Sequence, residues 1–141
     1  MFKTILVALD GSQSIDQVMV AVYQFRLEPE TKVILSHVVS SAGSEFELIA
    51  DKPHLNSEEL PYRHIEKLLQ SYQEKLPCQS EVEIVAGDAA EEIVRLANIY
   101  KADLIVIGSR GLTGLKRILE GSVSSQVVAD AACSVLVVKA V

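Results

Sequence analysis

The chain has 141 residues, 49% of them apolar, and its 13 lysines and arginines against 19 aspartates and glutamates give a net charge of −6. This composition excludes a disordered chain, and the acidic balance gives no electrostatic reason to expect nucleic acid or an anionic membrane as a partner. Apolar runs such as residues 5–9 are far shorter than the roughly 18 residues of a membrane span. Two cysteines, Cys78 and Cys133, form neither a disulfide framework nor a metal-ligand spacing. We therefore expect one cytoplasmic domain over residues 1–141.

Runs typical of strands alternate with helical patterns along the chain. Residues 5–9 are continuously apolar, as in a strand buried on both faces, and the next apolar stripe has helical spacing. In the third predicted strand, residues 81–85, polar and apolar residues alternate only in part, so we expect this strand at a half-exposed edge of the sheet. Residues 40–57 are expected to form a long variable loop. The predicted strands are residues 4–9, 32–39, 81–85, 102–107 and 134–138, and helical stripes cover residues 18–25, 65–76, 93–100 and 123–131.

Strict alternation of strand and helix implies right-handed crossovers and a parallel, doubly wound sheet with helices on both faces. Proteins of this class commonly have a dinucleotide-binding or a flavodoxin-like strand order, and five strands favour the smaller, flavodoxin-like plan. The predicted fold class is therefore α/β, with a Rossmann-like open sheet of five parallel strands.

Four of the seven glycines fall between positions 108 and 121. This segment follows the fourth predicted strand directly and ends at Gly121 and Ser122, where the last helix is expected to begin. Glycines let backbone N–H groups approach a phosphate, and a helix N-terminus attracts an anion. Arg110 adds positive charge in an otherwise acidic chain. The segment therefore predicts a phosphate site, the alternative being glycines that only shape a long turn.

The spacing of these glycines excludes two common phosphate motifs. No glycine precedes a Lys-Ser or Lys-Thr pair as a Walker A loop requires. The series Gly108, Gly111 and Gly114 follows the fourth strand rather than the first, so it is not the dinucleotide fingerprint.

The glycine segment instead resembles a pattern of the universal stress protein family. Gly108-x2-Gly111-x9-Gly121-Ser122 is similar to the nucleotide-binding pattern of that family, Gly-x2-Gly-x9-Gly-[Ser/Thr]. The similarity also runs through residues 5–12 and 133–138. It covers the whole chain apart from the segment around residues 40–60, where the family itself varies.

The resemblance implies a sheet of strand order 3-2-1-4-5 that binds ATP, AMP or a related adenine nucleotide. Carried over by position, Asp10 meets the ribose and phosphates, directly or through Mg²⁺. Ala8 and Val38 border the adenine, and Ile107 packs on the nucleoside. Ala8 departs from some nucleotide-bound relatives, which have proline there. The implied nucleotide-binding residues are Ala8, Leu9, Asp10, Val38, Ile107, Gly108, Arg110, Gly111, Gly121, Ser122, Val123 and Ser124.

The implied strand order points to the same place independently. In that order the first and fourth strands are neighbours whose connections leave on opposite faces, which is where open α/β sheets bind ligands. Asp10 follows the first strand and Gly108 follows the fourth, so we expect both at this position.

Other kinds of site fit the sequence less well. A receiver domain needs an acidic cluster around Asp10, but Asp88 is expected to cap a helix instead. His37 is expected to be a hydrogen-bonded core residue rather than a catalyst. No Gly-x-Ser-x-Gly nucleophile elbow is present, and no base besides Asp10 is evident. We therefore expect little or no turnover.

The last predicted strand is wholly apolar from Val135 to Val138, although the implied order puts it at a sheet edge. An apolar edge without charges favours pairing with another chain. We therefore predict a homodimer that pairs through the last strand at Val135, Leu136, Val137 and Val138.

The sequence as a whole predicts a cytoplasmic stress-response or signalling module that binds an adenine nucleotide. Two alternatives stay open. One is a nucleotide-independent dimeric adaptor on the same fold. The other is a slow ATPase or autophosphorylating protein, with Ser122 or Ser124 as the nearest hydroxyls.

Overall fold

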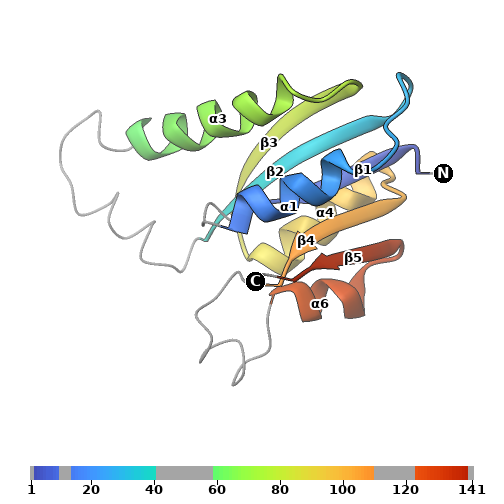
Figure 1. Ribbon diagram of the computed structural model, residues 1–141. Coiled ribbons are helices and arrows are strands. Elements are labelled where there is room, and N and C mark those ends of the chain that lie inside the picture. Colours follow the sequence, from blue (N-terminus) through green and yellow to red (C-terminus); the bar gives the residue numbers. More distant parts are fainter. Residues whose placement is uncertain (1, 10–13, 41–58, 110–122, 140–141) are drawn as a thin grey trace.

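A computed structural model of the chain describes residues 2–9, 14–40, 59–109 and 123–139 (Figure 1). The five strands form one sheet in the order β3-β2-β1-β4-β5, and every neighbouring pair is parallel. The predicted α/β fold class and the order 3-2-1-4-5 are therefore confirmed. The elements in chain order are β1 (Thr4–Ala8), α1 (Ser14–Tyr23), β2 (Lys32–Ser40), α3 (Glu59–Gln73), β3 (Gln79–Gly87), α4 (Ala89–Tyr100), β4 (Leu104–Gly108), α6 (Val123–Asp130) and β5 (Ser134–Val138).

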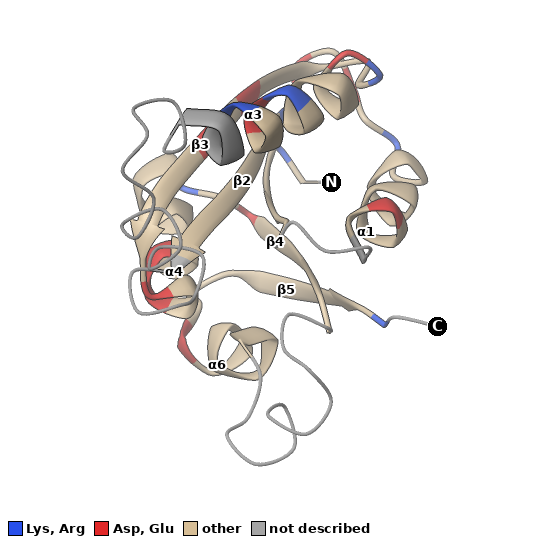
Figure 2. Ribbon diagram, turned by 90° about the vertical axis from the view of Figure 1, so that its left-hand side faces the viewer, with Lys and Arg blue, Asp and Glu red and all other residues tan. Residues whose placement is uncertain are grey.

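The sheet is the middle layer between two layers of helices. α1 and α3 pack on one face, and α4 and α6 pack on the other (Figure 1, Figure 2). Along β1, Ile5 and Val7 point to α1 and α3, whereas Leu6 and Ala8 point to α4 and α6. All four side chains are buried, as the continuous apolar run predicts. None of the described helices combines the length and the apolar character of a membrane span.

β3 is the edge strand that the sequence predicts, and it is longer than residues 81–85. It extends over Gln79–Gly87 because β2 runs beside it and pairs with it throughout. Glu81 forms an ion pair with Lys32 of β2, and Tyr100 of α4 donates a hydrogen bond to Glu83 at 3.0 Å. Both acidic side chains of this half-exposed strand therefore have polar partners on β2 or α4.

Helix α4 begins at the cap that its sequence predicts. The Oδ2 atom of Asp88 accepts a hydrogen bond from the Glu91 amide at 3.0 Å. This bond satisfies one of the N–H groups that a first helical turn leaves without a partner. Asp88 is thus a structural acid at the end of β3.

Candidate functional site

The carboxyl ends of β1 and β4 meet in the middle of the sheet. Ala8 is in register with Ile107 of β4 on one side and with Ser36 of β2 on the other. After β1 the chain continues to α1 on one face, and after β4 it continues to α6 on the opposite face (Figure 1). This is the topological switch point at which open α/β sheets bind ligands. Ala8 and Ile107 therefore lie side by side where the sequence predicts a site.

Four of the predicted site residues share one face of the sheet at this position. Ala8 and Ile107 are 8% and 5% exposed, and Val38 of β2 and Val123 of α6 pack, partly buried, against the same apolar cluster. All four lie on the side of α4 and α6. Apolar side chains gathered at a strand end can pack on a flat, apolar part of a ligand.

Leu9 lies at the same edge, but its side chain points the other way. The side chain is 3% exposed and packs with α1 and α3. The Leu9 amide donates to the Ser36 carbonyl at 2.8 Å, and the Leu9 carbonyl accepts from Nδ1 of His37 at 2.9 Å. Only the main chain of Leu9 is therefore placed at the predicted site, and His37 is the hydrogen-bonded core residue that the sequence predicts.

The predicted phosphate end starts on β4 and continues at α6. Gly108 is the last residue of β4 and pairs with Val138, and the Ser109 amide donates to the Val138 carbonyl at 2.9 Å. α6 begins at Val123 and has no acidic residue in its first turn, where Ser124 is buried. A helix N-terminus without acidic side chains keeps its attraction for an anion.

The other predicted site residues lie outside the described part of the chain. β1 is described through Leu9, β4 through Ser109 and α6 from Val123, so the structure fixes the chain on either side of them. Within the described ranges, no group of three or more His, Cys, Asp or Glu side chains could hold a metal ion. The Mg²⁺ contact stays a prediction. The predicted residues outside the description are Asp10, Arg110, Gly111, Gly121 and Ser122.

Ser36 is a polar residue at this edge that the predicted site omits. Its side chain is fully buried, and its hydroxyl donates to the Val7 carbonyl at 2.9 Å. Together with His37 it interrupts an otherwise apolar stretch between residues 33 and 39. That interruption is the sequence signal that points to both side chains.

The rival sites gain no support from the described residues. Asp88 uses its carboxylate as a helix cap rather than in an acidic cluster. Burial raises the pKa of the Cys78 and Cys133 thiols. Both thiols therefore favour the protonated form, which is a poor nucleophile and a poor metal ligand.

The strand order, together with a candidate site at the β1–β4 switch point, defines a flavodoxin-like α/β protein. The chain belongs to the universal stress protein family, whose family model matches residues 1–139.

Individual relatives agree with this assignment over nearly the full chain. Universal stress protein MJ0577 of Methanocaldococcus jannaschii is 33% identical over 155 residues, which cover 99% of this chain and 96% of the relative. The solved structure of MJ0577 aligns with a TM-score of 0.78 at 31% identity, over 100% of this chain and 98% of that chain. A universal stress protein in complex with cAMP aligns with a TM-score of 0.72 at 25% identity, over 97% and 96% of the two chains. A family member from Arabidopsis thaliana with AMP bound shares the fold, with a TM-score of 0.68 at 18% identity, over 97% of this chain and 91% of that chain.

Proposed function

We propose that this chain is an adenine-nucleotide-binding module of stress response or signalling, with little or no turnover. The observation that carries the proposal is the motif Gly108-x2-Gly111-x9-Gly121-Ser122, which starts where β4 ends at the switch point of the sheet. The related structure with bound cAMP supports an adenine nucleotide as the ligand.

In this proposal the adenosine part lies at the ends of β1, β2 and β4. The adenine borders Ala8 and Val38, and the nucleoside packs on Ile107. These three side chains belong to one apolar face, which suits a flat purine. Leu9 takes part by holding the main chain that leads to Asp10, because its side chain packs on the opposite face and its amide and carbonyl are bound to Ser36 and His37.

The phosphates follow the glycines toward the N-terminus of α6. Glycines let backbone N–H groups approach the phosphate oxygens, and the helix terminus and an arginine add positive potential. Asp10 meets the ribose and phosphates, directly or through Mg²⁺, which would neutralise phosphate charge when bound. The proposed phosphate contacts are Gly108, Arg110, Gly111, Gly121, Ser122, Val123 and Ser124.

We infer low turnover from Asp10 and from the bases that the described strand ends offer at this position. Hydrolysis of a γ-phosphate needs a positioned water and a stabiliser of the developing charge. Asp10 is assigned to the ribose, the phosphates and the metal. His37 uses Nδ1 for the Leu9 carbonyl inside the core.

We also propose that the protein is a single-domain, cytoplasmic homodimer that pairs through β5. The two edges of the sheet differ: β3 carries Glu81 and Glu83, whereas Ser134–Val138 carry no charge (Figure 2). Leu136 of β5 is 38% exposed. An uncharged apolar edge offers unpaired backbone groups to a second copy. The proposed dimer contact is Val135, Leu136, Val137 and Val138.

Calorimetric titration with ATP, AMP and cAMP tests the nucleotide proposal. We expect the wild type to bind at least one of them. Gly121→Leu should weaken binding by about 100-fold or more, because a side chain would separate the phosphate from the backbone donors of the helix terminus.

Gly114→Leu is the matched control, since Gly114 lies in the same segment but outside the motif. Its affinity should stay close to that of the wild type. A wild type that binds none of the three nucleotides would overturn the proposal and favour the nucleotide-independent adaptor.

A further inference from the structure

Two polar side chains of β2 donate hydrogen bonds to carbonyls of β1 beside the proposed site. The Ser36 hydroxyl donates to the Val7 carbonyl at 2.9 Å, and Nδ1 of His37 donates to the Leu9 carbonyl at 2.9 Å. Ser36 and His37 are 0% and 3% exposed. Both bonds lie at the carboxyl end of β1, the end that leads into the proposed nucleotide site.

The contact with Leu9 places a proton on Nδ1 of the His37 ring. A carbonyl oxygen can only accept a hydrogen bond, so the neutral ring carries its proton on Nδ1. The other ring nitrogen, Nε2, is then an acceptor. It is buried and has no hydrogen-bond partner among the described residues.

Core packing alone does not account for a histidine at position 37. The side chains of Val33 and Leu35 alternate onto the same face of β2 and are fully buried, apolar members of the cluster under α1 and α3. Among the described residues Nε2 has no partner, so the ring brings a buried polar atom into the cluster that an apolar side chain would not. The contact with the Leu9 carbonyl is therefore what distinguishes His37 from its apolar neighbours.

That contact holds the main chain where β1 ends. The Leu9 amide is already bound to the Ser36 carbonyl, so the His37 ring ties the second backbone group of the same residue to β2. Val38, the next residue, points to the opposite face together with Ala8. The His37 ring therefore lies on the face away from the proposed adenine contacts and acts on the site through Leu9.

We propose that His37 is a positioning residue for the nucleotide site. Its Nδ1–H holds the Leu9 carbonyl and thereby fixes the course of the chain that leads into Asp10. This inference rests on the proposed nucleotide binding.

Two variants distinguish the effect of the hydrogen bond from the effect of the packing of the ring. His37→Leu removes the donor and keeps an apolar side chain of similar size. His37→Asn keeps a donor, because its amide nitrogen occupies the position of Nδ1. In calorimetric titration with ATP, the leucine variant should bind about tenfold more weakly or worse, and the asparagine variant should stay within about threefold of the wild type.

Thermal unfolding of both variants serves as the stability control. The leucine variant should unfold within about 5 °C of the wild type, because loss of the Leu9 bond is offset by removal of Nε2, a buried nitrogen with no partner among the described residues. If the leucine variant does not fold, His37→Gln replaces it, because its amide is one bond too far out to reach the Leu9 carbonyl.

The nitrogen-15 spectrum of the histidine rings gives a readout that does not depend on nucleotide. The His37 signal, assigned by its loss in His37→Asn, should show the proton on Nδ1. A proton on Nε2 would overturn the inference. So would a leucine variant that binds ATP as tightly as the wild type, or leucine and asparagine variants that lose the same amount of ATP affinity. If the wild type binds no nucleotide, the proposed nucleotide-binding function itself is wrong. The positioning role of His37 then fails with it, whichever ring nitrogen carries the proton.

Discussion

Asp103 joins the start of β4 to the start of β1. Its Oδ2 atom accepts hydrogen bonds from the amides of Lys3 at 2.8 Å and Thr4 at 3.0 Å, and its own amide donates to the Thr4 carbonyl at 2.8 Å. The Thr4 and Lys3 amides lower the pKa of the Asp103 carboxyl, because the carboxylate accepts their bonds better than the neutral acid does.

The lowered pKa makes this contact depend on pH. A carboxyl with a lower pKa in the folded state stabilises the fold above its ordinary pKa of about 4, and the contribution is lost as the pH falls through the folded value. Asp103→Asn should therefore lower the melting temperature at pH 7, and the difference from the wild type should shrink toward pH 2. Circular dichroism melting curves at both pH values measure this difference.

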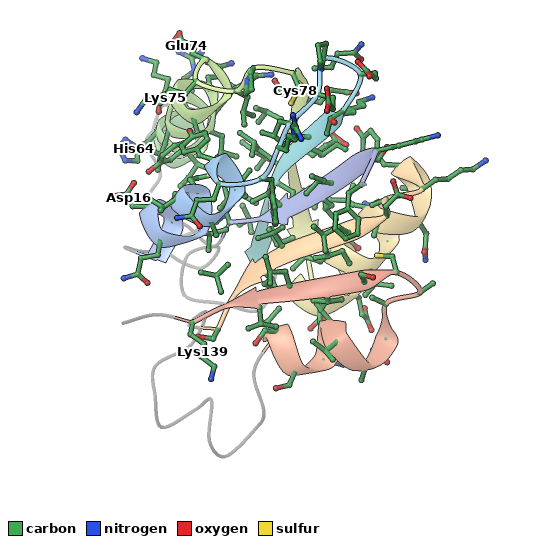
Figure 3. All side chains as sticks on the ribbon, turned by 45° about the vertical axis from the view of Figure 1, so that its right-hand side comes forward. Asp16, His64, Glu74, Lys75, Cys78 and Lys139 are labelled. Atoms are coloured by element: carbon green, nitrogen blue, oxygen red, sulfur yellow. The ribbon has the colours of Figure 1, made fainter. Side chains whose placement is uncertain are left out.

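Glu74→Gln is the control for the loss of one exposed carboxylate (Figure 3). Its melting temperature should follow that of the wild type at both pH values. If Asp103→Asn lowers the melting temperature by the same amount at pH 7 and at pH 2, the charge of Asp103 does not have the proposed role.

At the scale of elements, α1 and α3 are held together by tyrosines. Tyr72 of α3 donates a hydrogen bond to the Asp16 carboxylate, and the hydroxyl of Tyr23 in α1 donates to the Tyr72 carbonyl at 3.2 Å. Figure 3 shows Asp16 on the side of α1 that faces α3. Burial, together with the Asp16 hydrogen bond, raises the pKa of Tyr72 to about 12. The phenol therefore stays protonated, and able to donate, throughout the neutral range.

The end of α4 carries a residue that its backbone conformation disfavours. Lys101 has φ 55° and ψ 48°, in the left-handed region. Its amide donates to the Asn98 carbonyl at 3.3 Å, and the Ala102 amide donates to the Ala97 carbonyl at 2.9 Å. This is a Schellman ending, whose left-handed position is usually occupied by glycine.

Lys101→Gly should therefore stabilise the protein by about 0.5–1 kcal/mol. The left-handed conformation costs a residue with a Cβ atom roughly 1–2 kcal/mol, and the greater freedom of glycine in the unfolded chain offsets part of the gain. Urea unfolding measures the change. Lys67→Gly, at an exposed position inside α3, is the control and should destabilise the protein by about 1 kcal/mol. Equal destabilisation by both changes would refute the conformational explanation.

At the scale of the whole molecule, the proposed dimer depends on the edge strand β5. Leu136→Lys places a charge on an exposed apolar side chain of that edge and should yield monomers in light scattering. Val137 is a poorer choice for this test because it packs against the core on the side of α4 and α6.

Val128→Lys on α6 is the control for the dimer experiment. Val128 is apolar and 52% exposed, against 38% for Leu136, but it does not belong to the edge strand. The Val128→Lys variant should keep the mass of the wild type. A dimeric Leu136→Lys variant, or a monomeric wild type, would rule out pairing through β5.

Much of the fold could be predicted because its signals are local. Continuous apolar runs predict β1 and β4 as buried strands, and Asp88 three residues before Glu91 predicts the start of α4; the structure confirms both. The ends of strands were less predictable. β3 extends to Gln79–Gly87 because backbone pairing with β2 continues past the residues whose side chains alternate.

The candidate site was predictable in position but not in the orientation of each residue. Ala8, Val38 and Ile107 share a face as the implied site requires, whereas the side chain of Leu9 lies on the other face. Successive residues of a strand point to opposite faces, so a run of neighbours taken from a motif necessarily includes one that points away. The bond from His37 to Leu9 was also not predictable, because it joins two strands whose register is set by the sheet.

The sequence by itself determined the alternation of elements, the two-sided burial of the central strands and the spacing of the glycines after β4. These properties depend on residues close together in the chain, whose apolar period and backbone freedom act locally. Only the tertiary structure decided that Asp103 holds the amides of Lys3 and Thr4 and that His37 holds the carbonyl of Leu9. Such contacts require the strand register, which is fixed when both faces of the sheet are packed at once.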